Sequence, residues 1–192
     1  NFGFWAGANS PQPGIYQPDV TSYDYDAPIN EMGQATPKYM ALRELTQKYS
    51  KKKLAPIPAP IPVITFPATK TQKYASIWDN LPAAKPIVQP LPMEMMNQYE
   101  GMILYRTKLI GHKSGTLRVD KVHDYATVFL NGRYIGSIDR TLGQHSIDLP
   151  VSNVENPVLD ILVESMGRIN FAAQMIDRKG ITDRVTLNGM TL

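Results

Sequence analysis

The sequence has no cysteine. A disulfide scaffold, a thiol nucleophile and a cysteine-ligated metal site are therefore excluded. Long apolar runs are also missing: the longest, residues 126–130, falls far short of the roughly 20 residues that span a bilayer. No basic-then-apolar signal peptide stands at the start, and the chain opens on Asn1 rather than on methionine. We therefore expect no membrane partner, and we expect a mature product or a piece of a longer protein.

Charged residues are few, at 19%, whereas hydrophobic residues make up 43% of the 192 positions. This composition is typical of a globular protein with a real core. The net charge is +3, but four lysines, Lys48 and Lys51–Lys53, crowd one predicted helix end. Because cations at that end complement the helix dipole, the charge does not indicate a polyanion partner, and we expect no nucleic-acid binding.

Proline is abundant, and its distribution divides the chain into three regions. Nine of the 16 prolines lie between Pro56 and Pro92. Proline at every second position fixes φ and favours an extended polyproline II segment. Residues 54–98 are therefore predicted to be a proline-rich linker, with a spacer favoured over a docking peptide. Residues 1–53 and 99–192 form the two flanking regions.

Residues 1–53 contain one predicted helix. Thr36 is a suitable N-cap, and Pro37 suits the first helical position. The helix has an apolar face at three- and four-residue spacing, formed by Tyr39, Leu42, Leu45 and Tyr49. One helix and an irregular loop cannot enclose a core, so this region must pack on something else.

Residues 99–192 are predicted to be strands separated by turns. Asn131-Gly132 lies between two β-rich runs and predicts a hairpin, because a type I′ turn needs positive φ at both central residues. The expected strands are 102–109, 116–122, 125–130, 133–138, 146–149, 158–163, 169–176 and 185–192. Short strands at this spacing favour a β-sandwich or jelly roll. We expect the inward-pointing residues to include Val128 and Leu130, with Leu159, Ile161 and Val163 from a facing strand.

Four carboxylates gather in one predicted loop: Asp19, Asp24, Asp26 and Glu31. Two facing carboxylates can hydrolyse a glycosidic bond, one as acid and one as nucleophile or base. The alternative, which the residues alone favour, is that these aspartates hold the loop by bonding backbone amides. Too few oxygen ligands are present to predict a Ca²⁺ site.

The histidines and aromatic residues give no defined site on their own. His112, His123 and His145 lie in separate contexts, so no metal site is predicted, and no phosphate-binding, dinucleotide-binding or nucleophile-elbow motif indicates a cofactor or catalytic group. Aromatic residues cluster near the start of the chain, at Phe2, Phe4, Trp5, Tyr16, Tyr23 and Tyr25. They fit either a sugar-stacking surface or a core.

Several separated motifs resemble one known family. These are Asn1–Asn9, Thr21–Pro28, Thr36–Arg43, Tyr99–Thr107, Val122–Ala126 and Leu162–Asn170. In this order they closely resemble family-35 glycoside hydrolases, the β-galactosidases of the lysosomal type. The resemblance covers nearly the whole chain except the proline-rich stretch.

The resemblance implies a mainly β chain: the last strand, loop and helix of a (β/α)₈ barrel in residues 1–53, then the linker, then the first jelly-roll β-sandwich in residues 99–192. Tyr25 matches the family tyrosine that contacts galactose. The parent is expected to be a retaining exo-β-galactosidase that acts on terminal β-linked galactose. The family's two catalytic glutamates lie on earlier barrel strands, upstream of Asn1, so no catalytic residue is assigned here and the chain alone is expected to be inactive.

Further expectations concern partners, location and class. The remainder of the barrel should cover residues 1–53 in the intact enzyme; without it, this region should pack on its own sandwich or self-associate. A periplasmic, secreted or lysosome-like location is expected. The alternative from another class is a non-catalytic sandwich module that binds carbohydrate or acts as a scaffold, which titration with galactose would distinguish.

Overall fold

The computed structural model describes residues 7–19, 26–111 and 114–192. Their contacts group into two compact units. One contains the described residues up to 19 together with those from Pro86 onward, and the other contains residues 26–85. Each unit is described by itself.

The unit of residues 26–85 is built around one helix, α1 (Pro37–Tyr49). The Thr36 hydroxyl accepts a hydrogen bond from the Tyr39 amide at 3.4 Å, as expected of an N-cap. None of the helix residues is buried, and Leu45 on the predicted apolar face is 54% exposed. The helix is therefore confirmed, while its apolar face is largely exposed within this unit.

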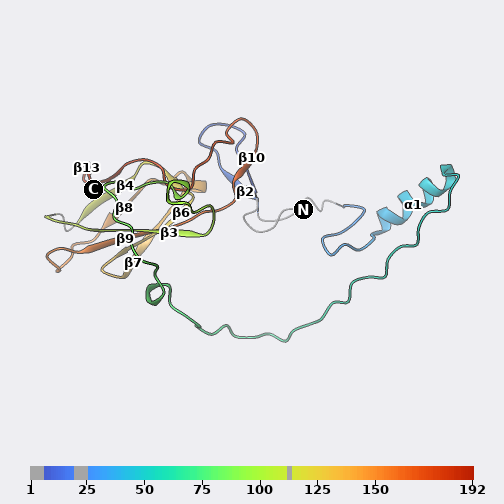
Figure 1. Cartoon of the computed structure of the whole chain (residues 1–192), viewed down its shortest axis with the longest axis horizontal. Coiled ribbons are helices and arrows are strands. Elements are labelled where there is room, and N and C mark those ends of the chain that lie inside the picture. The colour runs from blue at the N-terminus through green and yellow to red at the C-terminus, as the bar shows by residue number, and fades with distance from the viewer. Residues whose placement is uncertain (1–6, 20–25, 112–113) are drawn as a thin grey trace. The chain divides into compact units, whose positions relative to one another are not determined.

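The proline-rich segment has almost no regular secondary structure. Only the short 3-10 helix η1 (Ile77–Asp79) interrupts residues 54–92. Alternating prolines explain this, because they remove backbone donors and keep the preceding residues extended. The segment is the green trace of Figure 1.

The larger unit is a β-sandwich of two four-stranded sheets (Figure 1). One sheet has the order β13-β12-β4-β8, with β13 (Met190–Thr191), β12 (Val185–Leu187), β4 (Gly115–Val119) and β8 (Ser146–Leu149). The other has the order β3-β9-β6-β7, with β3 (Met102–Lys108), β9 (Val158–Glu164), β6 (Tyr125–Leu130) and β7 (Arg133–Asp139). The 3-10 helices η2 (Met93–Met96) and η3 (Arg140–Leu142) precede β3 and β8.

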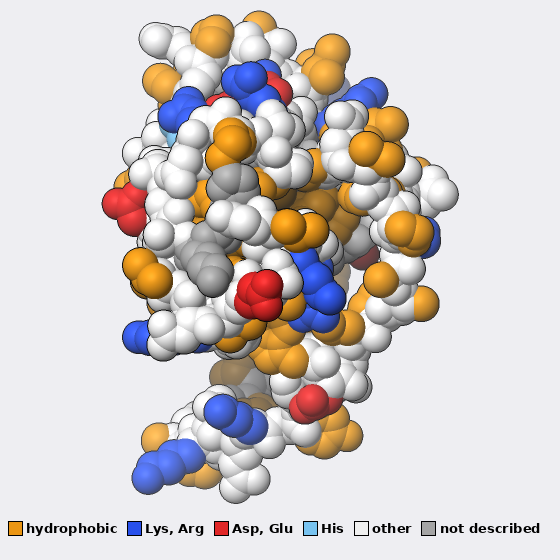
Figure 2. Space-filling model, turned by 90° about the vertical axis from the view of Figure 1, so that its left-hand side faces the viewer, with side chains coloured by type: hydrophobic (Ala, Val, Ile, Leu, Met, Phe, Trp, Pro, Cys, Tyr) orange, Lys and Arg blue, Asp and Glu red, His pale blue; other side chains and the backbone are white. Residues whose placement is uncertain are grey.

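The core lies between these two sheets, as period-two alternation requires. Alternate residues of β6 and β9 point inward and are buried, including Val128 and Ile161. The opposite sheet contributes the buried side chains Leu117, Val119, Leu149, Val185 and Leu187. Scattered hydrophobic side chains also reach the surface, which is normal for a folded domain, and on the face in Figure 2 they lie among charged ones.

The predicted pairing of the core strands was wrong in one respect. Leu159, Ile161 and Val163 are buried as expected, but β9 lies beside β6 in the same sheet, with Val128 opposite Ile161 and Leu130 opposite Leu159. They are therefore cross-strand neighbours and not residues of a facing sheet. Alternation identifies which residues point inward, but it does not say which strands share a sheet.

The predicted strands 169–176 and 185–192 were too long. The first is limited to β10 (Ile169–Phe171), after which Ala172 has a φ of 77°. The second is a hairpin of β12 and β13 around Asn188-Gly189, which have φ of 51° and 82°. This is the same Asn-Gly signal that marks the first hairpin.

Two small sheets complete the unit. β5 (Val122–His123) pairs with β11 (Gly180–Ile181). β1 (Gly7–Asn9) lies between β10 and β2 (Gln17–Asp19), parallel to the former and antiparallel to the latter. The described residues before position 20 thus add strands to the sandwich unit.

The predicted mainly β fold with a β-sandwich is confirmed. The division of the chain at residues 53 and 98 stays a prediction.

The Asn131-Gly132 turn yields the first testable prediction. Gly132 has a φ of 75° and no atom within 4 Å of an added Cβ, so a substitution there meets backbone strain but no clash. We expect Gly132→Val to lower the free energy of unfolding by about 1–3 kcal/mol, because β-branched residues are strained at positive φ. Urea denaturation measures it, with Arg133→Val as the neighbouring strand control. An unchanged midpoint for Gly132→Val would contradict the turn assignment.

Candidate functional site: a buried ion cluster in the sandwich unit

The predicted sugar-contacting residue, Tyr25, lies outside the described residues, as do Phe2, Phe4, Trp5 and Tyr23. Tyr16 is the one described member of that aromatic group. It is 4% exposed and belongs to a core cluster with Ala8 and Ile169. Of the two interpretations of the aromatic group, a sugar-stacking surface or a core, Tyr16 fits the core.

The loop carboxylates have structural surroundings where they are described. Asp26 has an 84% exposed side chain and forms an ion pair with Lys38 at 3.4 Å. Asp19 ends β2, and its Oδ2 is buried without a hydrogen-bond partner. Asp24 lies outside the described residues.

The histidines do not form a metal site in the part of the chain that the structure describes, where no group of three potential ligands occurs. His145 is exposed, and His112 lies outside the description. Among the described helices, none has the length and apolar character of a membrane-spanning segment.

The structure instead reveals a buried ion cluster that the sequence did not indicate. We call it the Lys179 cluster, and its members are Tyr16, Asp124, Arg140, Asp177 and Lys179. The Lys179 side chain is fully buried and uses all three of its donors. Its Nζ lies 2.6 Å from Asp124 Oδ2, 2.7 Å from Asp177 Oδ2 and 2.9 Å from the Gly167 carbonyl oxygen.

Strand register brings these residues together. β5 pairs with β11 so that His123 lies opposite Gly180, which places Asp124 beside Lys179. β6 pairs with β7 so that Tyr125 lies opposite Asp139, and the next pair along joins the Arg140 amide to the Asp124 carbonyl oxygen at 3.0 Å. Asp124 therefore has Lys179 beside it through the β5–β11 pairing and Arg140 beside it through the β6–β7 pairing.

Arg140 completes the charge balance. Its Nη1 lies 2.6 Å from Asp124 Oδ1 and 2.8 Å from Asp177 Oδ1. Two buried carboxylates thus face two cations, and Asp124 Oδ2 also accepts a hydrogen bond from the Met166 amide at 3.0 Å. Such pairing is what makes buried charge tolerable, because desolvation of an unpaired ion costs several kcal/mol.

Tyr16 attaches the first described segment to the cluster. Its hydroxyl donates to the Gly167 carbonyl oxygen and lies 3.2 Å from Asp124 Oδ2. The Tyr16 ring lies beneath the Arg140 guanidinium, whose Cζ is 4.2 Å from the ring centroid. Lys179 Nζ lies 4.9 Å from the same centroid. Both contacts are in the range of cation–π attraction.

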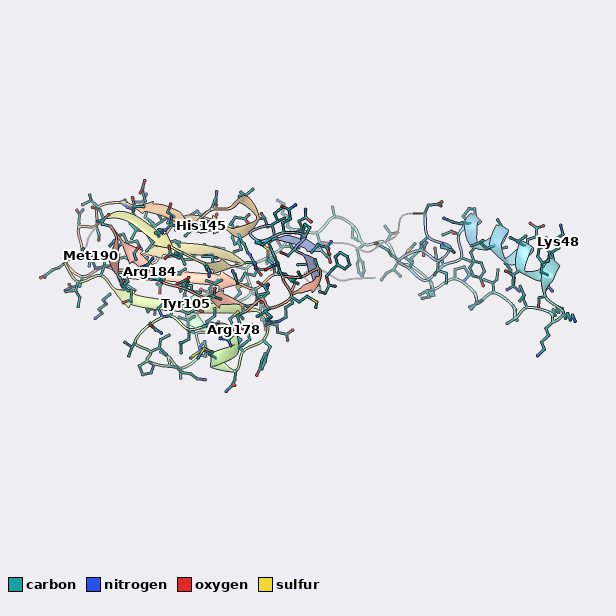
Figure 3. All side chains as sticks on the ribbon, turned by 90° about the horizontal axis from the view of Figure 1, so that it is seen from above. Lys48, Tyr105, His145, Arg178, Arg184 and Met190 are labelled. Carbon is teal, nitrogen blue, oxygen red and sulfur yellow. The ribbon has the colours of Figure 1, made fainter. Side chains whose placement is uncertain are left out.

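A second group of polar contacts, within the same unit, joins residues 91–99 to residues later in the chain. Glu94 accepts from Arg168 Nη1 at 2.7 Å and from the Lys179 amide at 3.1 Å. The Tyr105 hydroxyl donates to the Leu91 carbonyl oxygen at 2.7 Å and accepts from the Ile181 amide at 3.0 Å. Figure 3 shows Tyr105 among the strands of this unit.

The environment shifts several pKa values. Burial, with the charge of Asp124, raises the pKa of Tyr16, and burial raises the pKa of Tyr105 to about 12. Burial, helped by the charge of Arg140, lowers the pKa of His123. Burial alone would raise the pKa of Asp177, but the neighbouring Lys179 and Arg140 outweigh it, so the pKa is lowered.

These features describe a structural cluster and not a reaction centre. Each charge has an opposite charge within 3 Å, and Lys179 and Asp124 are fully buried. A general acid needs a proton that it can release to a substrate, and a nucleophile needs an open approach. The cluster could not be recognised from the sequence, because most of its members are far apart along the chain.

Comparison with known proteins finds family matches for two regions of the chain. Residues 90–192 match the family model described as "Beta-galactosidase, first all-beta domain", and residues 1–49 match "Glycosyl hydrolases family 35". The chain belongs to the family-35 glycoside hydrolases. The resemblance seen in the sequence motifs is thereby confirmed.

Individual family-35 relatives align with the whole chain. A beta-galactosidase of Xanthomonas manihotis is 40% identical over 195 residues, which cover 100% of this chain and 32% of that protein. A beta-galactosidase of Bos taurus is 37% identical and Beta-galactosidase 17 of Arabidopsis thaliana is 38% identical, each over 100% of this chain and 30% of the relative. The chain thus spans about a third of the length of the curated relatives that it matches.

The two family-35 regions meet in the Lys179 cluster. Tyr16 falls within the residues that match the glycosyl hydrolase model, whereas Asp124, Arg140, Asp177 and Lys179 fall within the first all-beta domain. The cluster therefore ties a piece of one family region to the body of the other.

Charge balance gives a prediction about Lys179. Lys179→Met leaves Asp124 and Asp177 with one cation between them, so we expect the free energy of unfolding to fall by about 3–5 kcal/mol. The matched control is Lys121→Met, since Lys121 pairs with Asp183 at 3.5 Å with side chains 60% and 46% exposed. Its loss should cost at most about 1 kcal/mol. Equal urea midpoints for the two variants would contradict the assigned role of Lys179.

The lowered pKa of His123 gives a pH prediction. As the pH falls, His123 takes up its proton in the unfolded chain, near pH 6.5, before it does so in the folded protein. The free energy of unfolding should therefore decrease from about pH 6.5 down to the lower pKa of the folded state, and level off below it. Asp177 has the same sign: its stabilisation is present above the unfolded pKa of about 3.9 and is lost as the pH falls through its lower folded value.

Urea unfolding at a series of pH values measures both steps. In His123→Asn, whose amide can still donate to the Arg178 carbonyl oxygen, the higher-pH step should shrink while the lower one remains. If the variant keeps the full decline below about pH 6.5, then His123 is not its source.

Proposed function

We propose that this chain is part of a retaining exo-β-galactosidase that removes terminal β-linked galactose. The observation that supports the proposal is a family-35 match over both regions together with beta-galactosidases 37–40% identical along the entire chain. Similarity that continues across two regions and their linker is stronger support than a fold alone, which hosts many functions.

The proposed reaction needs two carboxyl groups about 5–5.5 Å apart, one as acid/base and one as nucleophile. We propose that neither is among residues 1–192. The buried Asp124 and Asp177 support this, because they are committed to Lys179 and Arg140. Asp26 is exposed at the surface of its unit and pairs with Lys38.

Tyr25 is the residue that we propose to contact the sugar. A phenol ring offers an apolar face to a pyranose, and its hydroxyl offers a hydrogen bond. The rest of the barrel is the proposed partner of α1, whose apolar face has no buried residue in its own unit. The substrate would then be held by Tyr25 while carboxylates from the rest of the barrel act on the glycosidic bond.

Activity assays test the proposal in two steps. The intact protein that contains this sequence should hydrolyse a chromogenic β-galactoside, and purified residues 1–192 should not. In the intact protein, Tyr25→Phe should keep the fold and weaken transition-state binding by about 0.5–1.5 kcal/mol, because one hydroxyl contact is lost.

Three outcomes would count against the proposal. An intact protein that leaves β-galactosides untouched would refute the activity. Turnover by residues 1–192 that disappears on changing Asp24 or Asp26 would move the active site into this chain. Binding of galactose by residues 1–192 in a calorimetric titration would favour a carbohydrate-binding module instead.

A further inference from the structure

We infer that Tyr16 is a positioning residue for the proposed hydrolysis. It fastens residues 7–19 to the sandwich, and these residues are the attached end of the chain that continues to Tyr25. This inference rests on the proposed function. It concerns a side chain that touches no substrate and acts through the backbone that follows it.

The attachment of residues 7–19 depends on few side chains. Its backbone joins the sandwich unit through the short β1–β10 pairing, with Ala8 opposite Ile169 and a register irregularity immediately after it. β2 lies at the outer edge of that three-stranded sheet. A three-residue edge strand is a weak attachment by itself, so the buried Tyr16 side chain becomes the main tie.

Tyr16 is bound on its ring and at its hydroxyl. The ring has two cations over it, at 4.2 Å and 4.9 Å, and the hydroxyl reaches the Gly167 carbonyl oxygen and Asp124. Both cations are themselves held by Asp124 and Asp177 and cannot easily leave. The Lys179 cluster thus forms a rigid receptor for one tyrosine from the region that matches the glycosyl hydrolase model.

Removing the tyrosine hydroxyl should loosen the segment without opening the receptor. In Tyr16→Phe, the Gly167 carbonyl oxygen still accepts from Lys179, and Asp124 Oδ2 still accepts from Lys179 and the Met166 amide. No buried acceptor is left unpaired, and the ring still lies under the cations. Tyr16→Leu removes both the hydroxyl and the ring, so its effect on the segment should be larger.

Tyr105→Phe is the matched control. Tyr105 is a partly buried tyrosine whose hydroxyl joins two backbone groups, those of Leu91 and Ile181. Its described hydroxyl contacts include none to residues 7–19. It should weaken the sandwich without selectively releasing β1 and β2. Any general effect of losing a tyrosine hydroxyl is thereby separated from the effect on residues 7–19.

Hydrogen exchange on residues 1–192 tests the attachment directly. We expect the amides of β1 and β2 to exchange several-fold faster in Tyr16→Phe and at least about tenfold faster in Tyr16→Leu, with β6 and β9 less affected. In Tyr105→Phe these β1 and β2 amides should change no more than those of the sandwich. If β1 and β2 keep wild-type exchange in Tyr16→Leu, the inference is overturned.

Kinetics on the intact protein test the consequence for the reaction. Tyr16→Leu should lower kcat/KM for a β-galactoside on the order of tenfold, Tyr16→Phe should restore most of it, and Tyr105→Phe should leave it unchanged. Equal losses of kcat/KM in Tyr16→Leu and Tyr105→Phe would show that Tyr16 has a merely structural role, and would overturn its assignment as a positioning residue. If the wild-type protein has no such activity, the proposed function fails, and the exchange result still decides whether Tyr16 is the tie.

Discussion

The buried ammonium group of Lys179 is the constraint on which the sandwich unit depends. A fully buried lysine must be paired, and here its three donors are satisfied by Asp124, Asp177 and the Gly167 carbonyl oxygen. Those two carboxylates require Arg140 for balance, and the two cations in turn provide the surface that receives the Tyr16 ring. Apolar packing between the two large sheets stabilises the sandwich, whereas the Lys179 cluster attaches residues 7–19 to it through Tyr16.

The attachment changes how the family's two regions should be understood. Residues 7–19 lie within the stretch that matches the glycosyl hydrolase model, yet they add strands β1 and β2 beside β10 of the sandwich unit. A family boundary drawn along the sequence and a structural boundary drawn from contacts therefore differ. At η2 the two boundaries agree, because Glu94 is bound to Arg168 and the Lys179 amide, and the first all-beta domain match also includes η2.

Much of the fold could be predicted because its signals are local. The Asn131-Gly132 hairpin, the alternation in β6 and the Thr36 cap each depend on a few neighbouring residues. The Lys179 cluster could not be predicted, because it depends on register. A bulge at Val128/Phe129 shifts the pairing so that Arg140, and not Asp139, meets Asp124. One extra residue in a strand, which no sequence pattern marked, thus decides which charge faces the buried carboxylate.

If Tyr16 ties residues 7–19 to the sandwich, these residues and the sandwich form one cooperative folding unit. Native-state hydrogen exchange of residues 1–192 at increasing urea concentrations tests this most directly. We predict that the β1 amides exchange through the same opening as those of β9, with free energies of opening that fall along a common line as urea is added. Exchange of β1 through a separate opening that urea hardly affects, at a much lower free energy than β9, would contradict it.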